Sequence, residues 1–146
     1  MKSEDVVELG ALMLEQHAGL RVRVGRCAEL SARLLLGEPV ANELAAELAR
    51  LREQFTAHVE AEERLLEPAL ATSDAWGPMR VERMLEEHAA EHTAFVSKLD
   101  GDTRTVAGRF AEFAEDLDAH MAAEERTFLS PKVIADAAAA HQRRAR

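Results

Sequence analysis

The chain has 146 residues, a length typical of one domain, and 47% of them are hydrophobic, enough to bury a sizeable core. Its formal charge of -9 would repel nucleic-acid phosphates and anionic lipids, so we expect neither a nucleic acid nor a membrane as partner. The single cysteine, Cys27, excludes an intrachain disulfide and a thiolate metal cluster. Because the first residues lack the apolar stretch of a signal peptide, we expect a cytoplasmic protein, of unknown oligomeric state.

Strong helix formers dominate the composition and Tyr is absent, so we predict an all-α fold. The first helix is predicted to start at Ser3, as an N-cap before two acidic residues, and to end at Gly37. Pro39 suits the first turn of a second helix, which is predicted to continue to about Ala71.

A third helix is predicted from the break at Gly77 to about residues 100–102. The fourth is predicted from about Thr103 to Pro131, and the Ala-rich tail, residues 132–146, is expected to form a short helix. The whole chain, residues 1–146, is expected to be one domain with a core over about residues 3–131. Because the connections are short, we predict an antiparallel up-down-up-down four-helix bundle with a short C-terminal helical tail.

Each predicted helix carries an apolar stripe whose members alternate between spacings of three and four residues, as expected of a helix with one buried face. In chain order the four stripes consist of Val6, Met13, His17, Leu20, Val24, Cys27 and Leu34; Leu44, Leu48, Leu51, Phe55, His58, Glu62 and Leu65; Val81, Leu85, His88, His92, Phe95 and Leu99; and Val106, Phe110, Phe113, Leu117, His120, Glu124 and Phe128.

Ionisable residues interrupt all four stripes, at positions that neighbouring turns fill with apolar side chains. A single buried histidine is more often a core residue bonded to a carbonyl, but seven unpaired polar groups at about 1–3 kcal/mol each would cost roughly 7–21 kcal/mol. A whole domain is stable by only about 5–15 kcal/mol. Side chains at i and i+4 share one helical face and can bind one ion. The candidate metal ligands are therefore His17, the pair His58 and Glu62, the pair His88 and His92, and the pair His120 and Glu124.

An internal repeat supports this interpretation. The pattern His-x-x-Ala-Glu-Glu-Arg occurs at residues 58–64 and again at residues 120–126. Each copy would deliver one imidazole and one carboxylate to the same point. Counting from the turns at about 1.5 Å per residue puts the ligands of the first three helices level, whereas the fourth helix must overhang its neighbour or begin later.

This ligand set resembles that of the hemerythrin-like family, also called the HHE cation-binding domain, over about residues 10–131. The resemblance implies two non-haem iron ions with an oxo or hydroxo bridge. It also implies that His88, His92 and His120 bind one iron, that His17 and His58 bind the other, and that Glu62 and Glu124 bridge them. Respiratory members use an Asp one residue further along the last helix, where this chain has Glu125. We expect Glu124 to be the bridge, because a spacing of four from His120 keeps one face.

The donor chemistry agrees with a two-metal site. Imidazole and carboxylate suit iron, manganese, zinc or copper, and seven donors are too many for one tetrahedral ion. Two octahedral ions offer roughly 12 positions, of which the protein and one bridging oxygen would fill about 11. Under the family's assignment the open position lies on the iron held by His17 and His58. A ferritin-like centre is disfavoured because the chain contains no Glu-x-x-His pair.

Three classes of function remain open at this stage: reversible binding of O2 or a related small ligand, enzymatic turnover of hydrogen peroxide or nitric oxide, and storage or donation of iron. An apolar surrounding, with Met13, Leu20 and Phe55 among the neighbours, and the absence of Tyr favour stable binding over fast turnover. Arg21, one turn after His17, is expected either to flank the open position or to extend to water.

Overall fold

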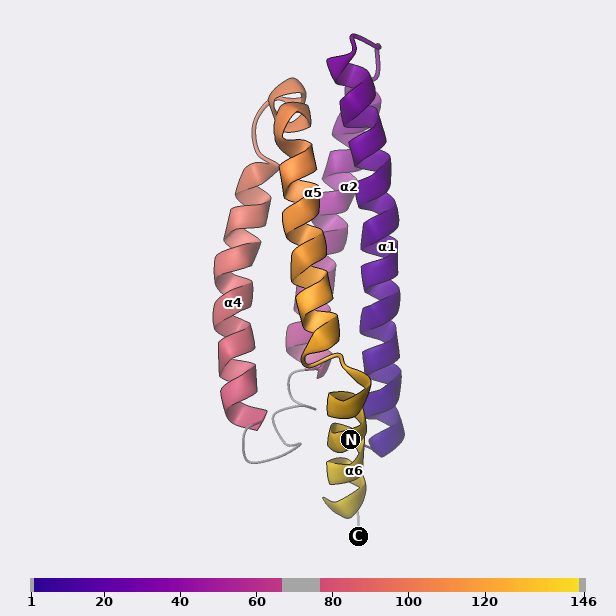
Figure 1. Cartoon of the computed structure of the whole chain (residues 1–146), viewed down its shortest axis with the longest axis vertical. Coiled ribbons are helices and arrows are strands. Elements are labelled where there is room, and N and C mark those ends of the chain that lie inside the picture. Colours follow the sequence, from indigo (N-terminus) through magenta and orange to yellow (C-terminus); the bar gives the residue numbers. More distant parts are fainter. Residues whose placement is uncertain (1, 67–76, 145–146) are drawn as a thin grey trace.

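The computed structural model describes residues 2–66 and 77–144, and these residues form five α-helices, one π-helical turn and no strand (Figure 1). The prediction of an all-α fold is confirmed. None of the described helices is long and apolar enough to cross a bilayer. The elements are α1 (Ser3–Leu35), α2 (Ala41–Ala61), the π-helical turn η1 (Glu62–Leu66), α4 (Gly77–Lys98), α5 (Thr103–Arg126) and α6 (Pro131–Arg144).

Two pairs of antiparallel helices make up most of the molecule. Gly37, with φ of 90°, ends the turn after α1 and lets α2 return along it. Gly101, with φ of 113°, does the same between α4 and α5. Both angles lie in the left-handed region that side-chain-bearing residues avoid, so glycine is required at both places. α1 packs against α2, α5 and α6, whereas α4 packs more loosely against α5 and α2.

The helix boundaries agree with the sequence where a local signal sets them. α5 begins at Thr103, as predicted, because the Asp102 carboxylate accepts hydrogen bonds from the Thr105 backbone N–H (3.0 Å) and hydroxyl (2.6 Å). It extends beyond the end of α4, which accounts for the mismatch in ligand height (Figure 1). The prediction that Ser3 is an N-cap is wrong: Lys2 is the cap, and its backbone N–H donates to Asp5 (2.7 Å).

One further predicted helix end is wrong, and another lies outside the described residues. The second helix leaves α-geometry after Ala61 and continues as the π-helical turn, and the rest of its predicted span, to Ala71, lies outside the described residues. The fourth helix ends at Arg126 rather than near Pro131, because the chain turns there and Pro131 starts α6.

The apolar core consists of two clusters separated by polar side chains. The larger cluster lies between α1, α2, α4 and α5 and includes Leu20, Phe55 and Phe113. The smaller one lies towards α6 and includes Met13 and Leu129. Cys27 is buried in the larger cluster, as predicted. On α4 the predicted stripe residue Leu85 is 42% exposed, and Met84 is buried instead.

Candidate metal centre

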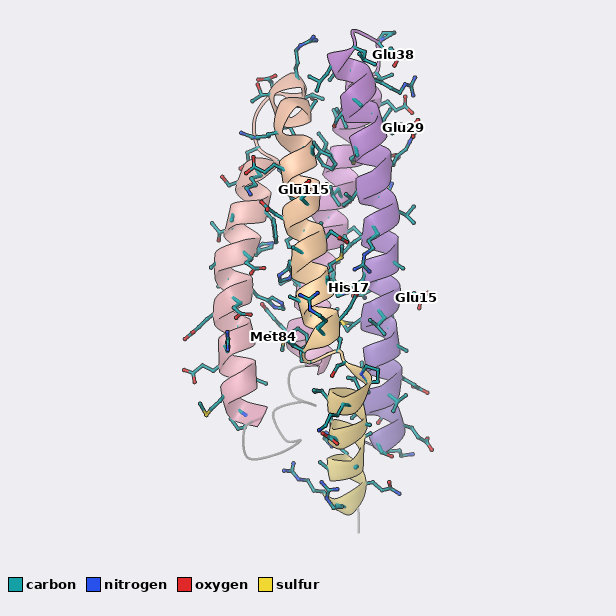
Figure 2. All side chains as sticks on the ribbon, in the orientation of Figure 1. Glu15, His17, Glu29, Glu38, Met84 and Glu115 are labelled. Atoms are coloured by element: carbon teal, nitrogen blue, oxygen red, sulfur yellow. The ribbon has the colours of Figure 1, made fainter. Side chains whose placement is uncertain are left out.

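Six of the seven predicted ligands meet in the polar layer between the two apolar clusters. α1 supplies His17, which lies inside the bundle (Figure 2). α2 supplies His58, and Glu62 is the first residue of η1. α4 supplies His88, and α5 supplies His120 and Glu124. Their ligand atoms form two groups, each within 4.8 Å, made of His17, His58, Glu62 and Glu124 and of His88, His120 and Glu124.

Both carboxylates face imidazoles from both helix pairs. Glu62 Oε1 lies 3.0 Å from His58 Nε2, and Glu62 Oε2 lies 3.0 Å from His88 Nε2. Glu124 Oε1 lies 2.7 Å from His120 Nε2 and 3.7 Å from His17 Nε2, while its Oε2 lies 3.6 Å from His88 Nε2. Each carboxylate is therefore placed to join two ligand groups.

The outer ring nitrogens of three histidines have oxygen partners. His17 Nδ1–H donates to Glu125 Oε2 (2.9 Å), His58 Nδ1–H donates to Gln16 Oε1 (2.6 Å), and His120 Nδ1 pairs with Glu91. With a cation bound, the ring proton of each of these histidines would sit on Nδ1 and each Nε2 would present a lone pair to the cation, the arrangement by which metal-binding histidines are oriented.

The distance between two of these inner nitrogens fits a shared cation. His17 Nε2 and His58 Nε2 are 3.1 Å apart, close enough for the two nitrogens to share either a hydrogen-bonding proton or a metal cation. Two nitrogens about 2.1 Å from one ion, in perpendicular directions, would be about 3 Å apart.

Unsatisfied buried atoms give the same indication. His88 Nδ1 and His92 Nε2 are buried without a hydrogen-bond partner among the described residues. The oxygens of Glu62 and Glu124 and the inner nitrogen of His88 are also buried, and they form close ion-pair contacts but no hydrogen bond of regular geometry. Native proteins rarely leave such atoms unpaired. Because these atoms are imidazole nitrogens and carboxylate oxygens, the residues present fit metal ions.

The electrostatics of the centre favour positive charge. Burial lowers the pKa of His88, but Glu124 and Glu62 outweigh it and raise that pKa to about 10. Burial also lowers the pKa values of His17 and His120. The neighbouring carboxylates outweigh this effect, so both pKa values are raised. For Glu62, burial would raise the pKa, yet the adjacent imidazoles lower it. Without metal the cluster holds protons, and a bound cation must displace them.

The chain matches the family model of the hemerythrin HHE cation-binding domain over residues 9–131. It belongs to this family. Neither the curated proteins nor the solved structures that were searched contain a match to it. A cation-binding hemerythrin domain accounts for the buried histidine and glutamate cluster.

One expected ligand of the hemerythrin centre lies outside both groups. The His92 ring stacks on Phe55, with ring centroids 5.5 Å apart and planes at 18°. Its role as a ligand stays a prediction.

A groove of about 810 Å³ between α4 and α5 reaches the hemerythrin centre, and its lining includes His88, Phe95, His120 and Glu124. The sequence predicted an apolar surrounding. That holds towards α1 and α2, where Met13, Leu20 and Phe55 are buried, but the side facing α4 and α5 is accessible.

The sequence did not predict the oxygen partners of the histidine rings. Gln16 and Glu91 each stand next to a predicted ligand in the chain, and adjacency gave no sign that they would contact other helices. Glu125 is the second glutamate of the repeat, whereas its counterpart Glu63 is exposed. Arg21 donates to Glu125 (2.9 Å) and Asp118 (3.2 Å), so it is joined to His17 through Glu125. Whether it flanks an open position stays a prediction.

Proposed function

We propose that the protein binds two non-haem iron ions at this centre, with an oxo or hydroxo bridge, and uses them to bind O2 or a related small ligand such as nitric oxide or peroxide. The observation that carries the proposal is the placement of Glu62 and Glu124 between imidazoles of both helix pairs. A single ion would leave one of the two ligand groups unused.

The proposed assignment gives His17 and His58 to one iron and His88, His92 and His120 to the other, with Glu62 and Glu124 bridging. Ferrous ions at these positions would supply two electrons to a bound oxidant. The chain's own contribution is orientation: Glu125, Gln16 and Glu91 hold the Nδ1 atoms, so that each Nε2 stays directed at its ion.

The same proposal includes the topology and the extent of the domain. We infer an antiparallel up-down-up-down bundle in a single domain, with a core over about residues 3–131 and a tail at residues 132–146. The two antiparallel helix pairs support the bundle, and the packing of α6 against α1 supports one domain.

A second candidate function is turnover of hydrogen peroxide or nitric oxide at the same centre. The groove between α4 and α5 favours it, because an opening of about 810 Å³ is far larger than a diatomic molecule needs and lets solvent exchange with the His88 and His120 side. The rings of Phe95 and His120, with centroids 5.8 Å apart, form part of its wall.

A single experiment tests the proposal and separates its two versions. The protein, loaded anaerobically with ferrous iron, is expected to retain about two irons per chain by elemental analysis, and its absorption spectrum should change on mixing with O2. A change that reverses under vacuum supports binding, whereas steady consumption of added hydrogen peroxide supports turnover.

His120→Ala removes one proposed ligand, and His141→Ala is its matched control because it removes a histidine outside the cluster. Only the first should lose iron. A wild-type content near one metal per chain, or a spectrum indifferent to O2, azide and peroxide alike, contradicts the proposal.

A further inference from the structure

Arg21 on α1 contacts two carboxylates of α5 at once. Its Nη2–H donates to Glu125 Oε1 (2.9 Å), and its Nε–H donates to Asp118 Oδ1 (3.2 Å). Asp118 and Glu125 are seven residues apart, about two helical turns, so both lie on the side of α5 that is next to α1. The planar guanidinium spans them because its donors point in fixed directions. Asp118 therefore holds Arg21, and Arg21 holds Glu125.

The contact with Arg21 fixes the carboxylate that orients His17. Glu125 Oε2 lies 2.9 Å from His17 Nδ1, so one oxygen of Glu125 contacts the ring and the other contacts Arg21. The Glu125 side chain is 27% exposed, whereas His17 is completely buried. Without Arg21, the carboxylate would be free to turn outwards into water and to leave the buried ring without its partner.

The other two histidines with outer partners lack this additional contact. His58 is paired with Gln16, an uncharged amide, and His120 is paired with Glu91. Among the described side chains, neither Gln16 nor Glu91 contacts an arginine or a lysine. The carboxylate beside His17 is thus the one that is itself held in place by a cation.

A contribution to folding does not account for this arrangement. Arg21 is 38% exposed, and ion pairs at such exposure contribute little to stability. Arg23 offers a comparison on the same helix: it is 33% exposed and donates to Glu47 (2.6 Å) and Gln54 (3.2 Å) of α2. In the part of the chain that the structure describes, neither of these two partners contacts a proposed ligand. The two arginines make similar contacts, but only Arg21 is connected to the centre.

We propose that Arg21 is a positioning residue of the metal centre: it holds Glu125 against His17 and so directs His17 Nε2 towards its cation. This inference rests on the proposed role of His17 as a ligand. Loss of a group that contacts a ligand typically weakens metal binding about 10–100-fold. Arg21 acts one contact further out, so we expect the lower end of this range.

The sign of the effect separates positioning from simple electrostatics. A positive side chain near the centre repels a metal ion, so loss of the Arg21 charge by itself would strengthen metal binding. Loss of the orientation of His17 weakens metal binding instead. The two roles therefore predict opposite changes in affinity.

The deciding experiment measures zinc affinity, by competition with a chelator, in the wild type, Arg21→Met and Arg23→Met. Zinc accepts imidazole and carboxylate ligands and has no redox chemistry, so the result does not depend on which small ligand iron binds. Arg21→Met should raise the zinc dissociation constant roughly 10-fold. Arg23→Met, which loses a comparable ion pair, should leave it unchanged. The melting temperatures of the two metal-free variants should be the same, so that weaker binding is not explained by a weaker fold.

Two further measurements test whether Arg21 acts through Glu125. In the Glu125→Ala background, Arg21→Met should change zinc affinity by less than about 2-fold, because the group that Arg21 holds is already absent. In the zinc-loaded wild type, nuclear magnetic resonance should detect the Nδ1 proton of His17. This proton should exchange with water roughly 10-fold faster in Arg21→Met and at the wild-type rate in Arg23→Met.

Zinc binding by Arg21→Met that equals or exceeds that of the wild type would overturn the role of Arg21 and leave the metal centre intact. An undiminished effect of Arg21→Met in the Glu125→Ala background would also overturn it. A wild type that binds no zinc would contradict the centre itself, and this inference with it. The expected zinc results together with an iron-loaded spectrum indifferent to O2, azide and peroxide would support the role of Arg21 and contradict only the proposed function.

Discussion

At the scale of single residues, Glu124 and Glu125 are neighbours with different tasks. Glu124 is 4% exposed and directs its carboxylate at the inner ring nitrogens, whereas Glu125 contacts the outer nitrogen of His17 and Arg21. We expect Glu124→Ala to lose iron, because the proposed bridging carboxylate disappears. Glu125→Ala should keep iron but bind it roughly 10–100-fold more weakly, because His17 loses the group that orients it. Competition with a chelator of known affinity measures both.

Glu115→Ala is the matched control for these variants, since Glu115 lies exposed on the same helix. Its iron affinity should equal that of the wild type. If Glu125→Ala abolished iron binding while Glu124→Ala retained it, the bridge would sit one residue later, as in the respiratory members of the family.

Local spacing accounts for the residues that the sequence identified correctly. His58 with Glu62, and His120 with Glu124, meet at one point because a spacing of four residues is sufficient to share a helical face. The partners of the outer nitrogens were not predictable in the same way. Gln16 reaches His58 from another helix, a contact that depends on how the helices pack rather than on any local pattern.

At the scale of the elements, α6 docks on α1 through a close approach at Gly10. A Cβ at this position would lie 3.0 Å from Ile134 Cδ1 and 3.3 Å from its Cγ1. Gly10→Val should therefore push α6 away and lower the free energy of unfolding by about 1–3 kcal/mol. Urea unfolding followed by circular dichroism measures the loss.

Gly108→Val provides the comparison, because the same substitution there enters open space within α5. It should change the free energy of unfolding much less than Gly10→Val does. Equal effects at the two positions would show that α6 does not rest on Gly10.

Element boundaries show what a sequence can and cannot specify. The start of α5 was predictable because an aspartate cap and its threonine partner act within one turn. The π-helical turn after Ala61 was not, because widening a helix by one residue per turn carries no compositional signal. This turn begins at Glu62, a proposed ligand, and such turns often occur at functional sites.

At the scale of the whole molecule, metal binding and folding are expected to be coupled. Removing metal leaves the buried atoms of Glu62, Glu124 and His88 with ion-pair contacts among themselves but without a regular hydrogen bond. Iron at 1,000 times its dissociation constant would add about 4 kcal/mol to the free energy of unfolding. A chelator should then lower the melting temperature by about 10 °C for a domain of this size.

Differential scanning calorimetry with and without chelator provides the measurement. The melting temperature of Glu124→Ala should be insensitive to both iron and chelator, since this variant is expected to be metal-free already. A wild-type melting temperature that chelation leaves unchanged would contradict this prediction, because it would show that metal binding does not stabilise the fold.

The six residues that meet at the centre come in equal numbers from the two helix pairs. α1, α2 and η1 together bring His17, His58 and Glu62, and α4 with α5 brings His88, His120 and Glu124. Neither helix pair holds a complete site, so a cation can be fully bound only after the two pairs have packed together, and it then holds them together. Iron supply would then regulate the amount of this protein as well as its activity. In an iron-starved cell a larger fraction of the chains would be unfolded, and unfolded chains are degraded by proteases.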